Sequence, residues 1–174
     1  MRRLMLLRHA KSERPPGLAD QARPLTGRGD AAARLMGAYM EHHGLVPDRV
    51  LCSPARRTRE TLAAAAAQWR GEVSATFEER LYAAPPEGIL SIIGAQPSEV
   101  KNLLVIGHNP GLHEAAQLLI ATGDVALRER LREKFPTAAL AVIDFAAEDW
   151  SLIHDRSGRL DRFIAPRPLA EATS

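Results

Sequence analysis

Two histidines, each placed directly after an apolar run, are the residues of this sequence with the most readily defined chemistry. His9 lies in the segment LLRHAKS, and His108 directly follows the run NLLVIG. A neutral imidazole nitrogen is a nucleophile near neutral pH, so His9 could attack phosphorus. The second histidine, if protonated, could stabilise charge on the equatorial oxygens of a phosphoryl group during transfer.

Arginines stand next to these positions. Arg8 immediately precedes His9, and Arg57 lies in SPARRTRET, which follows a third apolar run. A guanidinium group stays charged and holds a phosphate through a rigid fork of N–H donors. Positive charge also lowers the pKa of a nearby histidine, which keeps the imidazole neutral, as nucleophilic attack requires.

The elements that must position these residues are short apolar strands alternating with amphipathic helices. The strands are predicted at 4–7, 49–52, 72–77, 102–107, 138–145 and 150–154. The helices are predicted at 26–44, 55–69, 86–95, 112–119 and 125–134. Ligands of open α/β sheets bind at the carboxyl ends of the strands. We therefore expect His9, Arg57 and His108 to meet at one edge of the sheet.

The same alternation predicts the fold class. It is typical of an α/β protein, here a single-domain three-layer sandwich with a mostly parallel central sheet and helices on both faces. A chain of 174 residues is long enough for one domain with a proper core. We expect the domain to span residues 1–165, followed by a C-terminal tail over 166–174.

Composition excludes several classes of protein. The hydrophobic fraction of 45% and the charged fraction of 25% are ordinary for a soluble domain. A net charge of +2 gives no broad field for nucleic acid or a membrane surface, and no apolar run could span a bilayer. The single cysteine, Cys52, suits a reducing compartment. We expect a cytoplasmic protein that binds neither nucleic acid nor membranes.

Other candidate sites are less convincing. Cys52 is not the nucleophile of a cysteine-dependent phosphatase loop, because Thr58 stands where that loop needs arginine. The segment GRGDAA imitates a dinucleotide fingerprint, but no strand precedes it. The pattern contains no metal-ligand cluster and implies no cofactor. The remaining histidines are interpreted as structural or surface residues: His42, His43, His113 and His154.

Five segments together resemble a known family. LLRHAKS resembles the Arg-His-Gly motif of the histidine phosphatase superfamily, the phosphoglycerate-mutase-like proteins, with Ala10 in place of glycine. SPARRTRET resembles the Ser-Pro-x-x-Arg segment of that family, and VIGHNPGL resembles its second-histidine motif. RPLTGRG and LYAAPPEGIL are similar to the short phosphohistidine phosphatases of the SixA type. The likeness covers roughly residues 3 to 145.

The resemblance implies roles for particular residues. It implies a phosphorylated intermediate on His9, with Arg8, Arg57 and His108 holding the phosphate. It places the proton-donating carboxyl on Glu79, with the adjacent Glu78 as the alternative. It also indicates Ser12 and Asn109 as substrate-binding residues, whereas Lys11 and Arg14 are interpreted as solvated loop charges.

We therefore expect a metal-independent phosphatase, without a cofactor, that works by two displacements through His9. The partner is expected to be a phosphorylated protein carrying phosphohistidine, because little chain remains to form a lid over a small substrate. A small-molecule phosphomonoesterase of the same superfamily is the alternative. A mutase is a weaker one, because it must keep its phospho-enzyme dry. A non-catalytic phosphate-binding module is the alternative from another class.

Overall fold

The structure is a computed structural model that describes residues 1–167 and 169. A seven-stranded sheet runs through its centre in the order β3-β2-β4-β1-β6-β7-β5. The strands are β1 (Arg2–Arg8), β2 (Arg49–Cys52), β3 (Ser74–Phe77), β4 (Asn102–Gly107), β5 (Ile120–Gly123), β6 (Leu140–Phe145) and β7 (Gly158–Ile164). β6 is antiparallel to both of its neighbours, and every other pair is parallel. The prediction of a mostly parallel sheet is confirmed.

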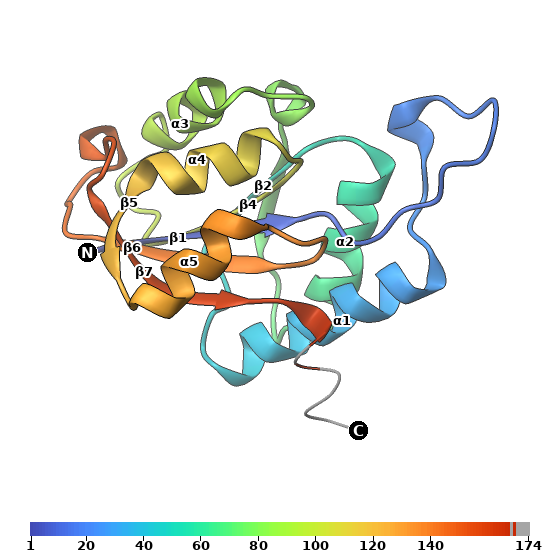
Figure 1. Cartoon of the computed structure of the whole chain (residues 1–174), viewed down its shortest axis with the longest axis horizontal. Helices are drawn as coiled ribbons and strands as arrows, with labels where there is room; N and C mark the ends of the chain where they lie inside the picture. The colour runs from blue at the N-terminus through green and yellow to red at the C-terminus, as the bar shows by residue number, and fades with distance from the viewer. Residues whose placement is uncertain (168, 170–174) are drawn as a thin grey trace.

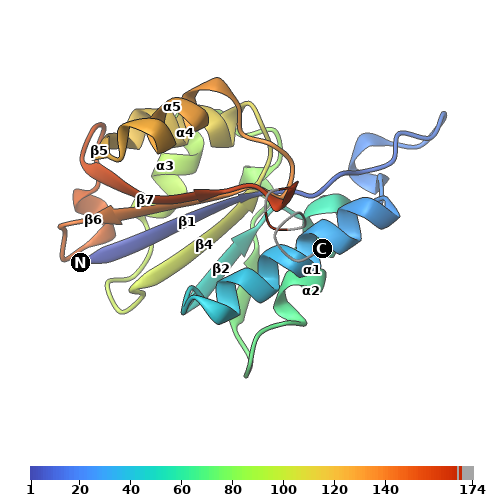
Figure 2. The same ribbon diagram turned by 60° about the horizontal axis from the view of Figure 1, so that its bottom comes forward.

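Five α-helices and three short 3-10 helices lie in the connections between the strands. The α-helices are α1 (Gly27–His42), α2 (Arg56–Ala66), α3 (Pro86–Gly94), α4 (Gly111–Leu119) and α5 (Val125–Glu133). The 3-10 helices are η1 (Asp20–Ala22), η2 (Glu79–Leu81) and η3 (Trp150–Leu152). Figure 2 shows α1 and α2 on one face of the sheet and α3, α4 and α5 on the other. The predicted three-layer sandwich is therefore present.

Alternating side chains of β1 form the centre of both apolar layers. Leu4 and Leu6 pack in the cluster that includes α3, α4 and α5, whereas Met5 and Leu7 pack in the cluster that includes α1 and α2. All four side chains are fully buried. A strand covered on both faces reads as a continuous apolar run, which is why this run predicted a strand.

The predicted start of α1 is confirmed in detail. The Thr26 side chain accepts a hydrogen bond from the backbone N–H of Gly29 at 2.9 Å, as an N-cap residue does. Gly29 lies so close to the chain that follows β1 that a Cβ atom there would stand 2.1 Å from the Lys11 carbonyl oxygen. Glycine at this position therefore lets α1 pack directly against the segment after His9.

The C-terminal part of the chain differs from the prediction. The strand expected at 150–154 is wrong, because Trp150–Leu152 forms η3; the buried Trp150 indole donates to the Val100 carbonyl at 2.7 Å. β5 and β7 were not predicted. The division into a domain over 1–165 and a tail stays a prediction, because residues 168 and 170–174 lie outside the described residues.

Candidate active site

Three neighbouring strands end together and bring the predicted residues to one edge of the sheet. β1 and β4 are parallel, and Arg8 pairs in register with Gly107, so His9 and His108 follow at the same level. The backbone N–H of His9 donates to the Gly107 carbonyl at 3.1 Å. β2 lies on the other side of β4 (Figure 2), and its register with β4 brings Ser53 and the start of α2 to the same edge.

His9 is held in one orientation by its own backbone. Its Nδ1 lies 2.8 Å from the carbonyl oxygen of Ala10. A carbonyl only accepts, so Nδ1 carries the proton and the neutral ring presents Nε2 as a lone pair. The ring is 8% exposed, and its burial lowers the pKa of His9 to about 3. His9 is therefore neutral at physiological pH.

His108 lies beside His9, with ring centroids 5.3 Å apart and the planes tilted by 51°. Its Nε2 is 2.7 Å from the buried Ser53 hydroxyl. Burial, and then the charge of Arg57, lower the pKa of His108 to about 4. His108 is thus neutral in the free site, whereas the role considered from the sequence requires its protonated form; a bound dianion would raise its pKa again.

The two arginines are held by different parts of the chain, Arg8 by Phe135 and Arg57 by Asp20. The positive charge of each guanidinium group contributes to lowering the pKa of His9. One Arg8 terminal nitrogen donates to the Phe135 carbonyl at 3.1 Å. Arg57, in the first turn of α2, is 6% exposed. The predicted grouping of His9, His108, Arg8 and Arg57 is therefore what the structure shows.

Several polar atoms of this group have no partner within the protein. Four buried atoms make no hydrogen bond to any described residue: Arg8 Nε, Arg57 Nε, His108 Nδ1 and Asn109 Oδ1. Buried donors are almost always satisfied in native proteins. If the Ser53 hydroxyl donates to His108 Nε2, then Nδ1 carries the proton and is a third unpaired donor. Unpaired N–H donors grouped in this way are suited to bind an anion.

Asp20 is the site residue that the sequence analysis missed. It begins η1 in the loop after β1, and its carboxylate accepts from Arg57 at 3.1 Å and from Arg23 at 2.8 Å. The Tyr82 hydroxyl also donates to it, and that bond is the main reason why the pKa of Asp20 is well below its ordinary value. Asp20 neither follows a predicted strand nor belongs to a recognised motif, so the sequence carried no signal for it.

Ser12 and Asn109 lie at the border of this group. The Ser12 hydroxyl accepts from an Arg23 terminal nitrogen at 2.6 Å, so it joins the network that passes through Asp20 to Arg57. The Asn109 amide donates to the Phe135 carbonyl at 3.0 Å, the oxygen that also accepts from Arg8. Their substrate-binding roles stay predictions.

The two candidate proton donors differ in their surroundings. Glu78 caps η2 and is paired with Arg80 at 2.9 Å, and this bond lowers the pKa of its carboxyl. The side chain of Glu79 is exposed and has no hydrogen bond or ion pair with any residue that the structure describes. Glu79 is thus the free carboxyl of the pair, although no contact joins it to His9.

Metal and membrane features are missing from the part of the chain that is described. Within residues 1–167 and 169, no group of three or more histidine, cysteine, aspartate or glutamate side chains could hold a metal ion. None of the described helices has the length and apolar character needed to cross a membrane. Burial raises the pKa of the Cys52 thiol to about 12, so it is a poor nucleophile.

Comparison with known proteins decides the family. The model of the histidine phosphatase superfamily (branch 1) matches residues 4–82. A solved structure named for the phosphohistidine phosphatase SixA of Agrobacterium tumefaciens is 32% identical, with a TM-score of 0.81 over 95% of this chain and 98% of that one. The chain belongs to the histidine phosphatase superfamily.

Further relatives agree with this assignment. A SixA structure from Nakamurella multipartitia superposes on this histidine phosphatase with a TM-score of 0.84 at 28% identity, covering 95% of this chain and 96% of that one. An uncharacterized protein of Mycobacterium tuberculosis is 39% identical over 163 residues, which are 92% of the phosphatase and the whole of the relative. The predicted family, SixA-type resemblance and hydrolase activity are confirmed.

Proposed function

We propose that this phosphatase removes the phosphoryl group from phosphohistidine on a protein, through a covalent intermediate on His9. The observation that carries the proposal is the state of His9. Its Nδ1 is fixed by the Ala10 carbonyl, and its pKa of about 3 leaves Nε2 as a free lone pair at neutral pH. Unpaired guanidinium donors of Arg8 and Arg57 lie in the same group.

The first displacement forms a bond between His9 Nε2 and phosphorus and breaks the bond between phosphorus and the substrate nitrogen. Arg8, Arg57 and the His108 N–H bind the equatorial oxygens, whose charge changes during transfer. The leaving imidazole takes a proton from Glu79 or from solvent water and departs neutral. It needs less help from an acid than an alkoxide does, which suits a site where Glu79 is an exposed donor.

The second displacement hydrolyses the phospho-enzyme. Water attacks phosphorus, the bond to His9 Nε2 breaks, and inorganic phosphate leaves with the oxygen of that water. The proton of the water passes to a carboxylate or to the product, and the Nδ1–H of His9 stays on the Ala10 carbonyl throughout. The ring thus returns to the tautomer from which it began.

A protein substrate is favoured by how the chain between Arg57 and His108 is used. β3 and η2 are short, and the apolar side chains of α3 are buried in the core, as Ile89, Ile92 and Ile93 show. A helix committed to core packing is not a movable lid. An open site of this kind admits a side chain carried on another protein. The SixA relatives are named as phosphohistidine phosphatases, which supports the same substrate.

The deciding experiment compares kcat/KM for phosphate release from a phosphohistidine peptide and from small sugar phosphates. We expect the peptide to be the better substrate, and His9→Ala to abolish release from both. Faster turnover of the small molecules would favour the phosphomonoesterase alternative. Wild-type protein that binds phosphate but is no more active than His9→Ala would identify a binding module.

A further inference from the structure

A groove with positively charged walls borders the segment that carries the nucleophile. It has a volume of about 620 Å³, and its lining includes Lys11, two residues beyond His9, and Thr137. Thr137 precedes Ala138, whose N–H donates to the carbonyl oxygens of both Arg8 and His9. The groove and the catalytic histidine therefore share the same backbone.

The topology places the groove on the catalytic edge of the sheet. β6 is antiparallel to β1, and β7 is antiparallel to β6, so β7 runs parallel to β1. Pro166, which also lines the groove, comes two residues after β7 and so lies at the edge where His9 follows β1. Residues from the first turns of α1 form the remaining wall.

The groove combines cationic walls with a small apolar surface. Lys11, Arg28 and Arg167 line it, and none of the described residues that line it carries a carboxylate. Lys11 and Arg28 are exposed, and neither side chain makes an ion pair or hydrogen bond with a described residue. Alanines of α1 and the half-buried Leu35 supply the apolar part. Charge complementarity therefore favours an acidic occupant with small apolar side chains.

We infer that this groove, here called the Lys11–Arg28 groove, binds the acidic segment that flanks phosphohistidine in the protein substrate. The inference rests on the function proposed above. Lys11 lies two residues beyond the nucleophile, so chain that flanks a phosphohistidine bound at His9 can extend over Lys11 into the groove. The close packing of Gly29 on the Lys11 backbone fixes the groove before the substrate arrives.

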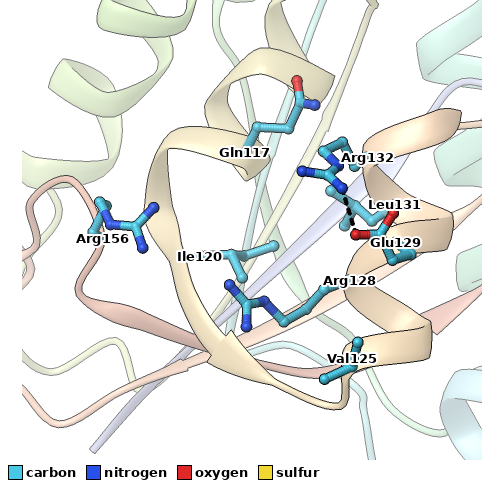
Figure 3. A pocket seen from close by; sticks show the side chains of 8 residues that line it. All are labelled: Gln117, Ile120, Val125, Arg128, Glu129, Leu131, Arg132 and Arg156. Carbon is cyan, nitrogen blue, oxygen red and sulfur yellow. Dashed lines mark hydrogen bonds and ion pairs between the residues drawn. The ribbon is translucent and has the colours of Figure 1, made fainter.

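A second basic groove serves as the comparison. It lies between α4 and α5, has a volume of about 270 Å³, and gathers Arg128, Arg132 and Arg156 around Ile120 (Figure 3). Ile120 begins β5, which is parallel to β7, so this groove lies towards the edge opposite His9. Arg132 is also paired with Glu129 inside it. The peptide segment next to a phosphohistidine bound at His9 is therefore not expected to bind in this groove.

The test uses two synthetic phosphohistidine peptides of equal length, one with glutamate flanks and one with glutamine flanks. We expect the wild type to prefer the glutamate peptide about tenfold in kcat/KM at low ionic strength, and less in high salt. Arg28→Glu should remove most of the preference. It should still fold, because an acidic residue in the first turn of α1 suits the helix dipole. Arg128→Glu is the matched control and should keep the preference.

The outcomes separate the two proposals. Equal rates with both peptides would overturn the inference and leave the proposed function intact. Loss of the preference in Arg128→Glu but not in Arg28→Glu would also overturn it. Hydrolysis of an aryl phosphate with no release from either peptide would contradict the proposed function, and the inference with it.

Discussion

The Arg57 guanidinium is held by Asp20 through two hydrogen bonds, one to the backbone oxygen at 2.8 Å and one to the carboxylate at 3.1 Å. The loop after β1, which extends away from the sheet in Figure 1, is thereby tied to the first turn of α2. The same carboxylate binds Arg23 and Tyr82. With Arg57 binding phosphate as proposed above, the Asp20 carboxylate would repel the bound dianion and compete with it for the guanidinium.

Asp20→Asn is therefore expected to strengthen inhibition by inorganic phosphate about fivefold, or about 1 kcal/mol, because Asp20 is half-exposed and acts on the scale of a surface pair. The amide oxygen of the variant still accepts a hydrogen bond from Arg57, so the orientation of the Arg57 guanidinium is kept. The inhibition constant is measured against an aryl phosphate at fixed ionic strength. Asp30→Asn, which only removes the pair with Arg34, is the control. Weaker inhibition in Asp20→Asn would contradict the prediction.

Ser53→Ala is expected to lower kcat about tenfold with a smaller change in KM, which corresponds to about 1.4 kcal/mol of transition-state stabilisation. The reason is the 2.7 Å contact between the Ser53 hydroxyl and His108 Nε2, which orients the ring. Steady-state kinetics on an aryl phosphate measures the effect. An unchanged kcat would show that His108 does not depend on Ser53.

Glu79→Gln is expected to slow hydrolysis of alkyl phosphates at least about tenfold, since an alkoxide leaving group needs a proton donor. Glu78→Gln is the matched variant, and it should have little effect on kcat because the carboxylate is already bound to Arg80. Comparison of the two variants on one alkyl phosphate decides between them. An equal loss of activity in both variants, or a larger loss in Glu78→Gln, would contradict the role of Glu79 as the proton donor.

Stability should fall in mildly acidic solution. The pKa values of His9 and His108 are lowered from 6.5 to about 3 and about 4 in the folded protein, so the unfolded chain binds more protons below pH 6.5. The free energy of unfolding therefore decreases as pH falls through that window, by up to about 1.4 kcal/mol per pH unit for each histidine. Urea unfolding at pH 7 and pH 5 measures it. In His9→Gln, the decrease in the free energy of unfolding that comes from His9 and His108 should be roughly halved. An unchanged pH dependence in this variant would contradict the lowered pKa of His9.

The sequence predicted those elements whose side chains are buried on both faces or on one regular stripe. β2 and β4 have the predicted bounds, because Arg49–Cys52 and Asn102–Gly107 are apolar runs between charged or polar neighbours. β7 was missed because charged residues interrupt it. Asp161 forms ion pairs with both Arg159 and Arg162 along that strand, so the sequence pattern of the strand resembles a polar loop.

The site was predictable only where it followed a strand. His9, Arg57 and His108 were found because strand ends bring such residues together, and the structure confirms that they meet. Asp20 could not be found in this way, because its place depends on how a long loop folds back onto α2. A sequence pattern does not contain that information. For the same reason Glu79 stays a prediction, since an exposed side chain is not positioned by packing.

The central claim is that His9 carries the phosphoryl group during turnover. The most direct measurement is rapid quenching after mixing with a radioactively labelled phosphohistidine peptide, followed by mapping of the protein-bound label. We predict an adduct that is stable in base, labile in acid and located on His9. The absence of any adduct before phosphate is released, or a label on another side chain, would contradict the account.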